Sequence, residues 1–265
     1  MITSFKYCLY FILLFLLWGC NGSDLKIDPN YPSYIKELSD EEQLRVLGQL
    51  EQMPVSGCVA VSRFGFPLFD LKNELCNVDS LWRISDDFET INNRAMQAFS
   101  DYAYFLNIEK PADVKIARIS TINNISYEQF SELYPDSAPT MWLVTSAPQV
   151  KNELSIRSAI LQVLLSPSDV VAVGGNWFND FLVLANEKFD EQAAKDLLLN
   201  VKLKSGSSSI LINENTFWYA SKKMVVPKMH ARKMELRVCW VLYPKGWSVT
   251  VDVYSGEIVS SEKIS

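Results

Sequence analysis

An uncharged apolar run at residues 7–18 constrains this chain most, because it decides which part is left to fold. Lys6 and the amino terminus place positive charge before the run, and the sequence becomes polar directly after Cys20. About a dozen residues are too few for a helix to cross the hydrocarbon core of a bilayer. The run is therefore interpreted as the apolar segment of a secretory signal, and the folded body must come from the sequence that follows it.

A cysteine stands where this signal should have a small residue for cleavage. The residues from Leu17 to Cys20 resemble the lipobox of bacterial lipoproteins. The resemblance implies that residues 1–19 form a lipoprotein signal peptide that is removed, and that Cys20 then carries acyl chains. More than one buried acyl chain attaches a protein stably to a membrane that it does not span. A plain signal peptide with an incidental Cys20 is the alternative.

The same resemblance implies export to a bacterial cell envelope. In Gram-negative members an aspartate after the cysteine tends to hold the protein at the inner membrane, so Asn21 favours the outer membrane. Residues 20–36 are predicted to form a flexible tether. The stretch from Asn21 to Ser33 is rich in Gly, Ser, Asp, Asn and Pro, and such a composition does not bury enough apolar surface to order itself.

Removal of 19 of the 265 residues leaves 246, which suffice for one large or two small domains with a hydrophobic core. We predict a first domain at 37–185 and a second at 186–265. Without Lys6, 24 of the 25 Lys and Arg residues remain against 31 acidic residues, a net charge of −7. Nucleic acid is not expected as a partner, because neutralising its phosphates needs clustered basic residues.

The order of helical and strand signals predicts the fold class. Ser39 and Glu42 form a capping-box pattern that begins a helix. Apolar spacing predicts further helices at 90–106, at 127–133 and from Asn152 toward Pro167, and strands at 114–119, 141–144, 170–173 and 181–184. Helices and strands mix without regular alternation, which indicates an α+β fold with a mixed, mostly antiparallel sheet and packed helices.

The last eighty residues or so carry a second resemblance. A helix from Asp190 to about Asn200 is expected to precede a three-stranded antiparallel meander, and residues 247–258 read Trp-Ser-Val-Thr-Val-Asp-Val-Tyr-Ser-Gly-Glu-Ile. This order resembles the PepSY module and the related propeptide module of thermolysin-like proteases. The resemblance implies a noncatalytic module in which Asp252, Gly256 and Glu257 hold a turn together. An unrelated hairpin is the alternative.

Two cysteines flank a predicted hairpin from Val59 to Leu71, with Gly65 and Pro67 at its turn. Export to an oxidising compartment favours a disulfide between Cys58 and Cys76, although spacing leaves the geometry of the pair open. Cys239 lies in an apolar strand pattern and is interpreted as a small buried residue.

Catalytic chemistry is poorly supported, because the chain has a single histidine, His230. One imidazole cannot build a multi-histidine zinc site, and there is no Cys-x-x-Cys pair, phosphate-binding loop or Gly-x-Ser-x-Gly elbow. No catalytic residue, metal site or cofactor is therefore assigned. Asp86, Asp87 and Glu89 could form a carboxylate cluster, but they more simply favour the start of the helix near Thr90.

Two surface features are candidates for binding. A basic segment between strands, expected to be a mobile loop, contains Lys222, Lys223, Lys228, Arg232 and Lys233. It could meet an anionic surface or an acidic protein, or serve solubility alone. Trp177, in Gly-Gly-Asn-Trp-Phe-Asn-Asp, stands in loop-like sequence where an exposed aromatic anchor would be possible.

Together these features predict a lipid-anchored, noncatalytic cell-envelope protein that binds another protein or a cell-wall component. The alternative is a cell-envelope hydrolase that uses His230 or a carboxylate cluster. A structural or assembly lipoprotein without a discrete site is a third possibility.

Overall fold

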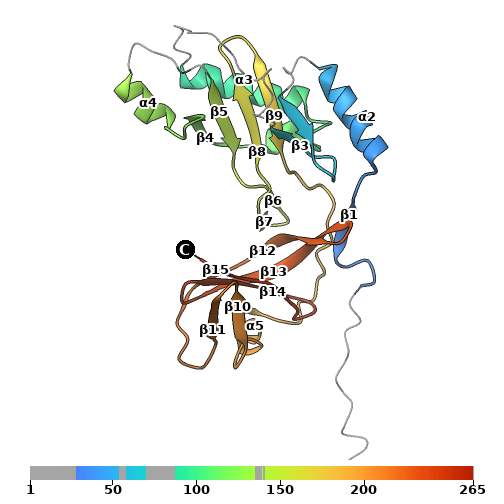
Figure 1. Cartoon of the computed structure of the whole chain (residues 1–265), viewed down its shortest axis with the longest axis vertical. Coiled ribbons are helices and arrows are strands. Elements are labelled where there is room, and N and C mark those ends of the chain that lie inside the picture. Colours follow the sequence, from blue (N-terminus) through green and yellow to red (C-terminus); the bar gives the residue numbers. More distant parts are fainter. Residues whose placement is uncertain (1–27, 54–57, 70–86, 135–138, 140, 265) are drawn as a thin grey trace, which may run out of the picture. The chain divides into compact units, whose positions relative to one another are not determined.

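A computed structural model describes residues 28–53, 58–69, 87–134, 139 and 141–264 (Figure 1). Cys20, Cys76 and Asp86 lie outside these residues, so the lipidation and the disulfide pairing stay predictions. Residues 32–265 form one compact unit, and the predicted domain boundary near residue 185 stays a prediction. Among the described residues, no helix combines the length and the apolar character that crossing a membrane requires.

A four-stranded antiparallel sheet carries the first core. Its order is β4 (Ile116–Thr121), β5 (Trp142–Ser146), β8 (Leu161–Leu165) and β9 (Val170–Gly175). Helix α3 (Phe88–Asp101) buries one stripe at helical spacing, made of Ile91, Ala95, Ala98 and Phe99, in the same cluster as Val144 and Val163. Asp87 caps α3, because its carboxylate accepts a hydrogen bond from the Thr90 N–H at 2.7 Å.

Smaller elements surround this sheet. Ser39 and Glu42 form the predicted capping box at the start of α2 (Asp40–Glu51), and Ser126 begins α4 (Tyr127–Leu133) with another. The predicted hairpin is confirmed as β2 (Val59–Val61) and β3 (Pro67–Phe69). A short 3-10 helix, η2 (Pro111–Asp113), precedes β4.

The helix predicted from Asn152 toward Pro167 is wrong. This stretch forms β7 (Leu154–Ile156) and β8, separated by a turn in which Ser158 has a φ of 61°. The apolar residues fit both periods, but Leu161, Val163 and Leu165 alternate along β8 into the core with α3, while Leu164 is buried in a separate cluster with Val171 and Ala172. Sheet pairing has therefore overridden the helical spacing. The strand predicted at 170–173 lies within β9, whereas residues 181–184 contain no strand.

A seven-stranded sheet contains the carboxyl-terminal part of the chain. Its path runs β15 (Ile258–Lys263), β14 (Trp247–Asp252), β13 (Lys233–Pro244), β12 (Trp218–His230), β7 and β6 (Val150–Lys151), and β1 (Ser33–Lys36) pairs with β13 off this path. The β7 and β12 pair is parallel, and the others are antiparallel. Residues 33–36, predicted as the end of the tether, thus form a paired strand.

The predicted α+β class with its carboxyl-terminal helix and three-stranded meander is wrong. Strands make up 39% of the described residues and helices 20%, and the chain ends in strands. Helix α5 (Glu191–Asp196) is only six residues long, and a small hairpin of β10 (Lys202–Ser205) and β11 (Ser208–Leu211) follows it. Asn200 adopts a φ of 64°, which ends helical geometry before the β-branched Val201. The meander itself has four strands, β12 to β15.

The turn between β14 and β15 depends on Gly256. Its φ is 73°, a region that side chains disfavour, and a Cβ there would lie 2.8 Å from Phe189 Cζ and 3.0 Å from Leu197 Cδ1. The turn therefore needs glycine both for its backbone conformation and for close packing against the segment around α5. Gly246, in the turn between β13 and β14, has nearly the same φ of 74° but no atom within 4 Å of such a Cβ.

We expect Gly256→Ala to lower the free energy of unfolding by about 2–4 kcal/mol, the sum of a positive-φ penalty and overpacking. Gly246→Ala is the matched control and should lose only the positive-φ part, about 1 kcal/mol. Urea denaturation of the purified proteins measures both. Equal losses in the two variants would show that the close approach at Gly256 is unimportant.

Candidate functional site

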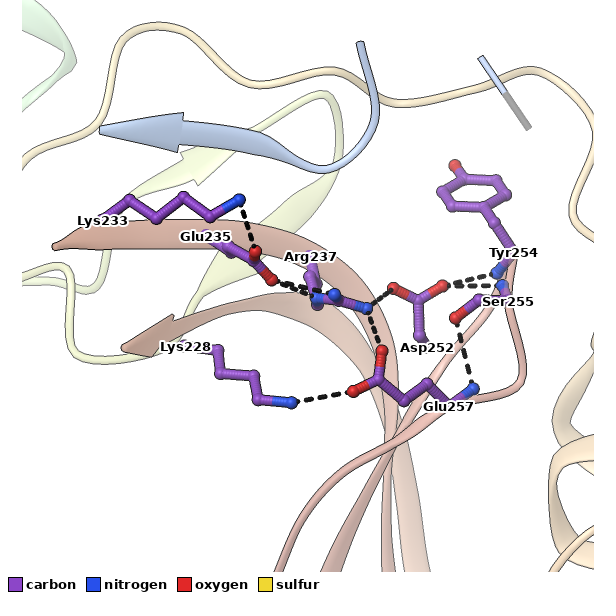
Figure 2. A network of polar contacts seen from close by, with 8 residues as sticks. All are labelled: Lys228, Lys233, Glu235, Arg237, Asp252, Tyr254, Ser255 and Glu257. Atoms are coloured by element: carbon purple, nitrogen blue, oxygen red, sulfur yellow. Dashed lines mark hydrogen bonds and ion pairs between the residues drawn. The ribbon is translucent and has the colours of Figure 1, made fainter. Parts of the chain in front are cut away.

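The best-defined cluster of ionised side chains lies where β13 changes its neighbour. Along one edge, β13 pairs with β1 from Lys233 to Leu236 and with β14 from Cys239 to Leu242. Arg237 stands between these two pairings. Because no strand covers this interval, the Arg237 side chain reaches the turn that connects β14 and β15 (Figure 2).

Arg237 contacts three carboxylates. Its guanidinium donates to Glu235 from Nε at 2.9 Å and lies 2.8 Å from the same carboxylate through Nη2. Its Nη1 lies 3.3 Å from Asp252 and 2.8 Å from Glu257. Two lysines extend the cluster at its ends, because Lys228 pairs with Glu257 at 2.9 Å and Lys233 pairs with Glu235 at 3.0 Å. We call these six residues the Arg237 network.

Asp252 is the buried centre of the Arg237 network, with none of its side chain exposed. Its Oδ1 accepts hydrogen bonds from the backbone N–H groups of Tyr254 and Ser255, each at 2.9 Å, while Oδ2 faces Arg237. The Ser255 hydroxyl accepts from the Glu257 N–H at 3.2 Å. Asp252 therefore ties the turn to β13, as an aspartate with two backbone donors and one cation should.

The Arg237 network shifts the pKa values of Glu235, Arg237 and Glu257. Burial would raise the pKa of Glu235, but hydrogen bonds from Lys233 and Arg237 outweigh it and hold this pKa below the usual value. The hydrogen bond from Lys228, aided by the charge of Arg237, lowers the pKa of Glu257. Burial opposes ionisation of Arg237, yet the surrounding carboxylates raise its pKa overall. All these groups are therefore ionised at neutral pH.

This arrangement joins strands and does not present reactive groups. Three cations face three carboxylates, so the charges of the Arg237 network neutralise one another. A general acid or base needs a pKa near the working pH, whereas the pKa values of Glu235 and Glu257 are shifted away from it. Within the described ranges, no group of three or more His, Cys, Asp or Glu residues could hold a metal ion.

The basic segment predicted as a mobile loop is instead made of paired strands. Residues 222–230 belong to β12 and residue 233 begins β13, joined by a turn at Ala231 and Arg232. Val225 and Val226 are adjacent in β12 and both are buried, as in a strand whose successive side chains point to opposite faces of a covered sheet. The loop prediction rested on the basic residues alone and did not take the apolar residues of this segment into account.

The predicted basic residues are not gathered into one free patch. Lys223 pairs with Glu187 at 2.5 Å, while Lys228 and Lys233 belong to the Arg237 network. Lys222 and Arg232 are exposed and make no ion pair with any described residue. Binding of an anion by the whole set would have to break pairs that already exist.

The structure places His230 at the surface and Trp177 in the core. His230 is exposed, and its imidazole has no hydrogen-bond partner among the described residues. Trp177, considered as a possible exposed anchor, is buried: only 6% of it is accessible, and it belongs to the core with α3. Its backbone oxygen accepts a hydrogen bond from Asn107 Nδ2 at 3.1 Å. The loop-like sequence misled here because a loop can still insert its aromatic residue into a core.

The cysteines are consistent with separate roles. Cys58 is buried and disulfide-bonded, and its predicted partner Cys76 is not among the described residues. Cys239 is a free buried cysteine, and burial raises the pKa of its thiol strongly. Its thiolate is thus disfavoured, which matches the predicted packing role.

Sequence reasoning missed an open groove of about 570 Å³. Five segments line it: β1 with the residues after it, α2, the turn of the β2 and β3 hairpin, the segment after α3 and the segment after β9. The residues that line the groove are far apart in the sequence, so no local motif could have predicted it. The exposed Tyr34 and Tyr104 lie on its lining.

Comparisons with known proteins give little further guidance. No protein-family model and no curated protein matches this chain. Among solved structures, the chain is similar to the Bacillus megaterium YpeB C-terminal domain, at 11% sequence identity and a TM-score of 0.33. That match covers 87% of this chain and 99% of the other. This likeness is weak.

We expect Arg237→Met to lower the free energy of unfolding by about 3–5 kcal/mol, because Asp252 stays buried without its cation. The matched control is Arg157→Met. Arg157 also pairs with a carboxylate, Glu262, at 2.7 Å, but this pair is exposed and should contribute about 0–1 kcal/mol. Chemical denaturation measures both losses. Similar small losses would contradict a stabilising role of the Arg237 network.

The lowered carboxylate pKa values predict a loss of stability in acid. Glu235 and Glu257 bind protons at a lower pH in the folded chain than in the unfolded chain, whose reference pKa is 4.5. Their contribution is therefore complete above that pH and disappears as the pH falls through the folded pKa values. Glu257→Gln should flatten the fall in unfolding free energy between about pH 5 and pH 3, whereas the exposed control Glu214→Gln should not. An unchanged slope in Glu257→Gln would contradict the assignment.

Proposed function

We propose that this protein is a lipid-anchored, noncatalytic cell-envelope protein whose folded body binds another protein or a cell-wall component. The observation that carries the noncatalytic part is the Arg237 network, in which three cations and three carboxylates neutralise one another. Ionised groups that satisfy each other at a strand junction stabilise a fold, and they have little capacity to exchange protons with a substrate.

We further propose that the carboxyl-terminal strands are a PepSY-like module. The support is local: the sequence Val-Asp-x-x-x-Gly-Glu-Ile at residues 251–258 supplies the buried Asp252, the positive-φ Gly256 and the Arg237 partner Glu257. These residues hold the turn between β14 and β15. Helix α5 and the β10 and β11 hairpin pack against the same strands through Ala194, Leu203 and Val249.

In the proposed function, the anchor attaches the protein to the membrane and the groove binds the ligand. Cys20, at the end of the lipobox-like sequence, would carry the lipid and hold the body at the outer membrane. The open groove would receive the ligand, since binding sites are commonly concave and built from several chain segments.

We expect Cys20→Ser to abolish incorporation of a radioactive fatty acid and to release the protein from the membrane fraction, because acyl chains supply the attachment. Cys8→Ser is the matched control: this cysteine lies within the signal, so label and fractionation should be unchanged. The measurement is metabolic labelling followed by membrane fractionation. Label in Cys20→Ser would contradict the anchor.

The proposed binding function is tested separately in the same cells. Capture from detergent-solubilised membranes should recover one partner, a protein or a wall fragment, in a fixed ratio. Recovery of no partner at a fixed ratio would instead favour a structural lipoprotein without a discrete site.

A further inference from the structure

The lining of the groove points to the class of ligand that it takes. At about 570 Å³, the groove falls in the range of small-molecule sites, about 300–1,000 Å³. This is space for a few sugar rings or a short peptide, and the choice between them depends on which groups the walls present.

The floor of the groove is held in place by a buried amide. Gln149, which is almost fully buried, donates from Nε2 to the Phe178 carbonyl at 2.7 Å and accepts from the Phe178 N–H at 2.8 Å. Asn179 Nδ2 donates to the Asn107 carbonyl at 2.6 Å, which joins the segment after β9 to the segment after α3. Fixed walls reduce the entropy lost when a ligand binds.

Two tyrosines give the groove exposed aromatic surface. Tyr104 is 81% exposed and Tyr34 is 63% exposed, although both line a concavity that already contains buried aromatic residues such as Phe178. The Tyr104 ring contacts Phe105 edge to face, with centroids 5.3 Å apart. An exposed ring beside a groove presents its electron-rich face, which attracts the C–H groups of a sugar ring.

The charges of the groove favour a ligand without net charge. Arg45 and Asp180 both line it, and neither forms an ion pair with a described residue. One cation and one anion give no preference for a charged ligand but supply donors and acceptors for hydroxyl groups. The side-chain oxygens of Asn107 and Asn179 add acceptors, since their hydrogen bonds to the backbone use only an amide N–H.

A peptide added as a strand fits less well. Such a peptide would pair with the outer edge of β1. The Leu182 N–H donates to the Ser33 hydroxyl at 2.7 Å, so the segment after β9 already runs beside that strand. Recognition must therefore come mainly from side chains.

We propose that the groove binds an uncharged oligosaccharide, with Tyr104 stacking on a sugar ring and the polar side chains of the walls bonding its hydroxyl groups. This inference rests on the proposed function, since it names the ligand class of the same site. It adds that the wall component is a glycan and that recognition does not depend on ionic attraction.

Isothermal titration calorimetry on the detergent-purified full-length protein tests this proposal. The probes are chitotetraose, which carries N-acetyl groups, cellotetraose, which does not, and an anionic cell-wall stem peptide. At least one oligosaccharide should bind saturably, and the affinity should be nearly the same at low and high salt because no ion pair is involved. Comparison of the two sugars distinguishes a wall-type glycan from a plain glucan.

Tyr104→Ala should weaken sugar binding about tenfold or more, because an aromatic anchor carries much of the binding energy. Tyr219→Ala is the matched control, since Tyr219 is also exposed, at 65%, contacts Phe217 edge to face and is absent from the groove lining. It should change the affinity less than about twofold. Unchanged unfolding of Tyr104→Ala by urea would confirm that the variant is folded.

Three results would overturn the proposal: no binding of either oligosaccharide, equal binding by Tyr104→Ala and the parent protein, or binding of the stem peptide alone. In each case, fatty-acid labelling and partner capture still report on the proposed function. Capture of a protein partner, together with no binding of either oligosaccharide, would refute the proposed glycan ligand. The proposed binding function would still be supported.

Discussion

The contact between Arg237 and Asp252 is the interaction on which the carboxyl-terminal sheet depends. β13 pairs with β1 over one half of its edge and with β14 over the other half, and Arg237 fills the interval between them. The Val253 N–H donates to the Val238 carbonyl at 3.0 Å in this interval, and a cation held by three carboxylates adds a side-chain connection there. The cost of burying Asp252 is offset because one oxygen faces the cation and the other accepts two backbone N–H groups.

The same interaction explains why this highly charged corner serves stability rather than chemistry. Each carboxylate of the Arg237 network has a cation within ion-pair distance, so its pKa is held low or its charge is compensated. A ligand would have to compete with these contacts. The open groove differs in this respect, because Arg45 and Asp180 are not committed to ion pairs among the described residues and two tyrosine rings are accessible. The proposed binding would therefore use mainly side chains outside the Arg237 network, although Lys233 of that network lies over the Tyr34 ring, 5.0 Å from its centroid.

Local signals in the sequence were reliable where a single short pattern sufficed. The capping box at Ser39, the helix at 127–133 and the hairpin with Gly65 all appear as predicted, because caps and turns depend on neighbouring residues. Predictions that required knowledge of distant partners were wrong. The stretch after Asn152 has helical spacing, yet strands on both sides of β8 recruit it into a sheet. Residues 222–233 were predicted to be a loop because of their charges, although the segment contains Val225 and Val226, which are buried in a strand.

The proposed export and lipid anchor rest on the sequence alone, since the signal-like run and the lipobox-like residues lie in one continuous stretch of chain. The sequence also determined the turn at Asp252, Gly256 and Glu257, where the demand for a positive φ leaves few residue choices. Tertiary structure alone decided that Arg237 faces three carboxylates, that Trp177 is buried and that five segments enclose a groove. These features depend on contacts between residues that are far apart in the sequence. The spacing of residues along the chain does not predict such contacts.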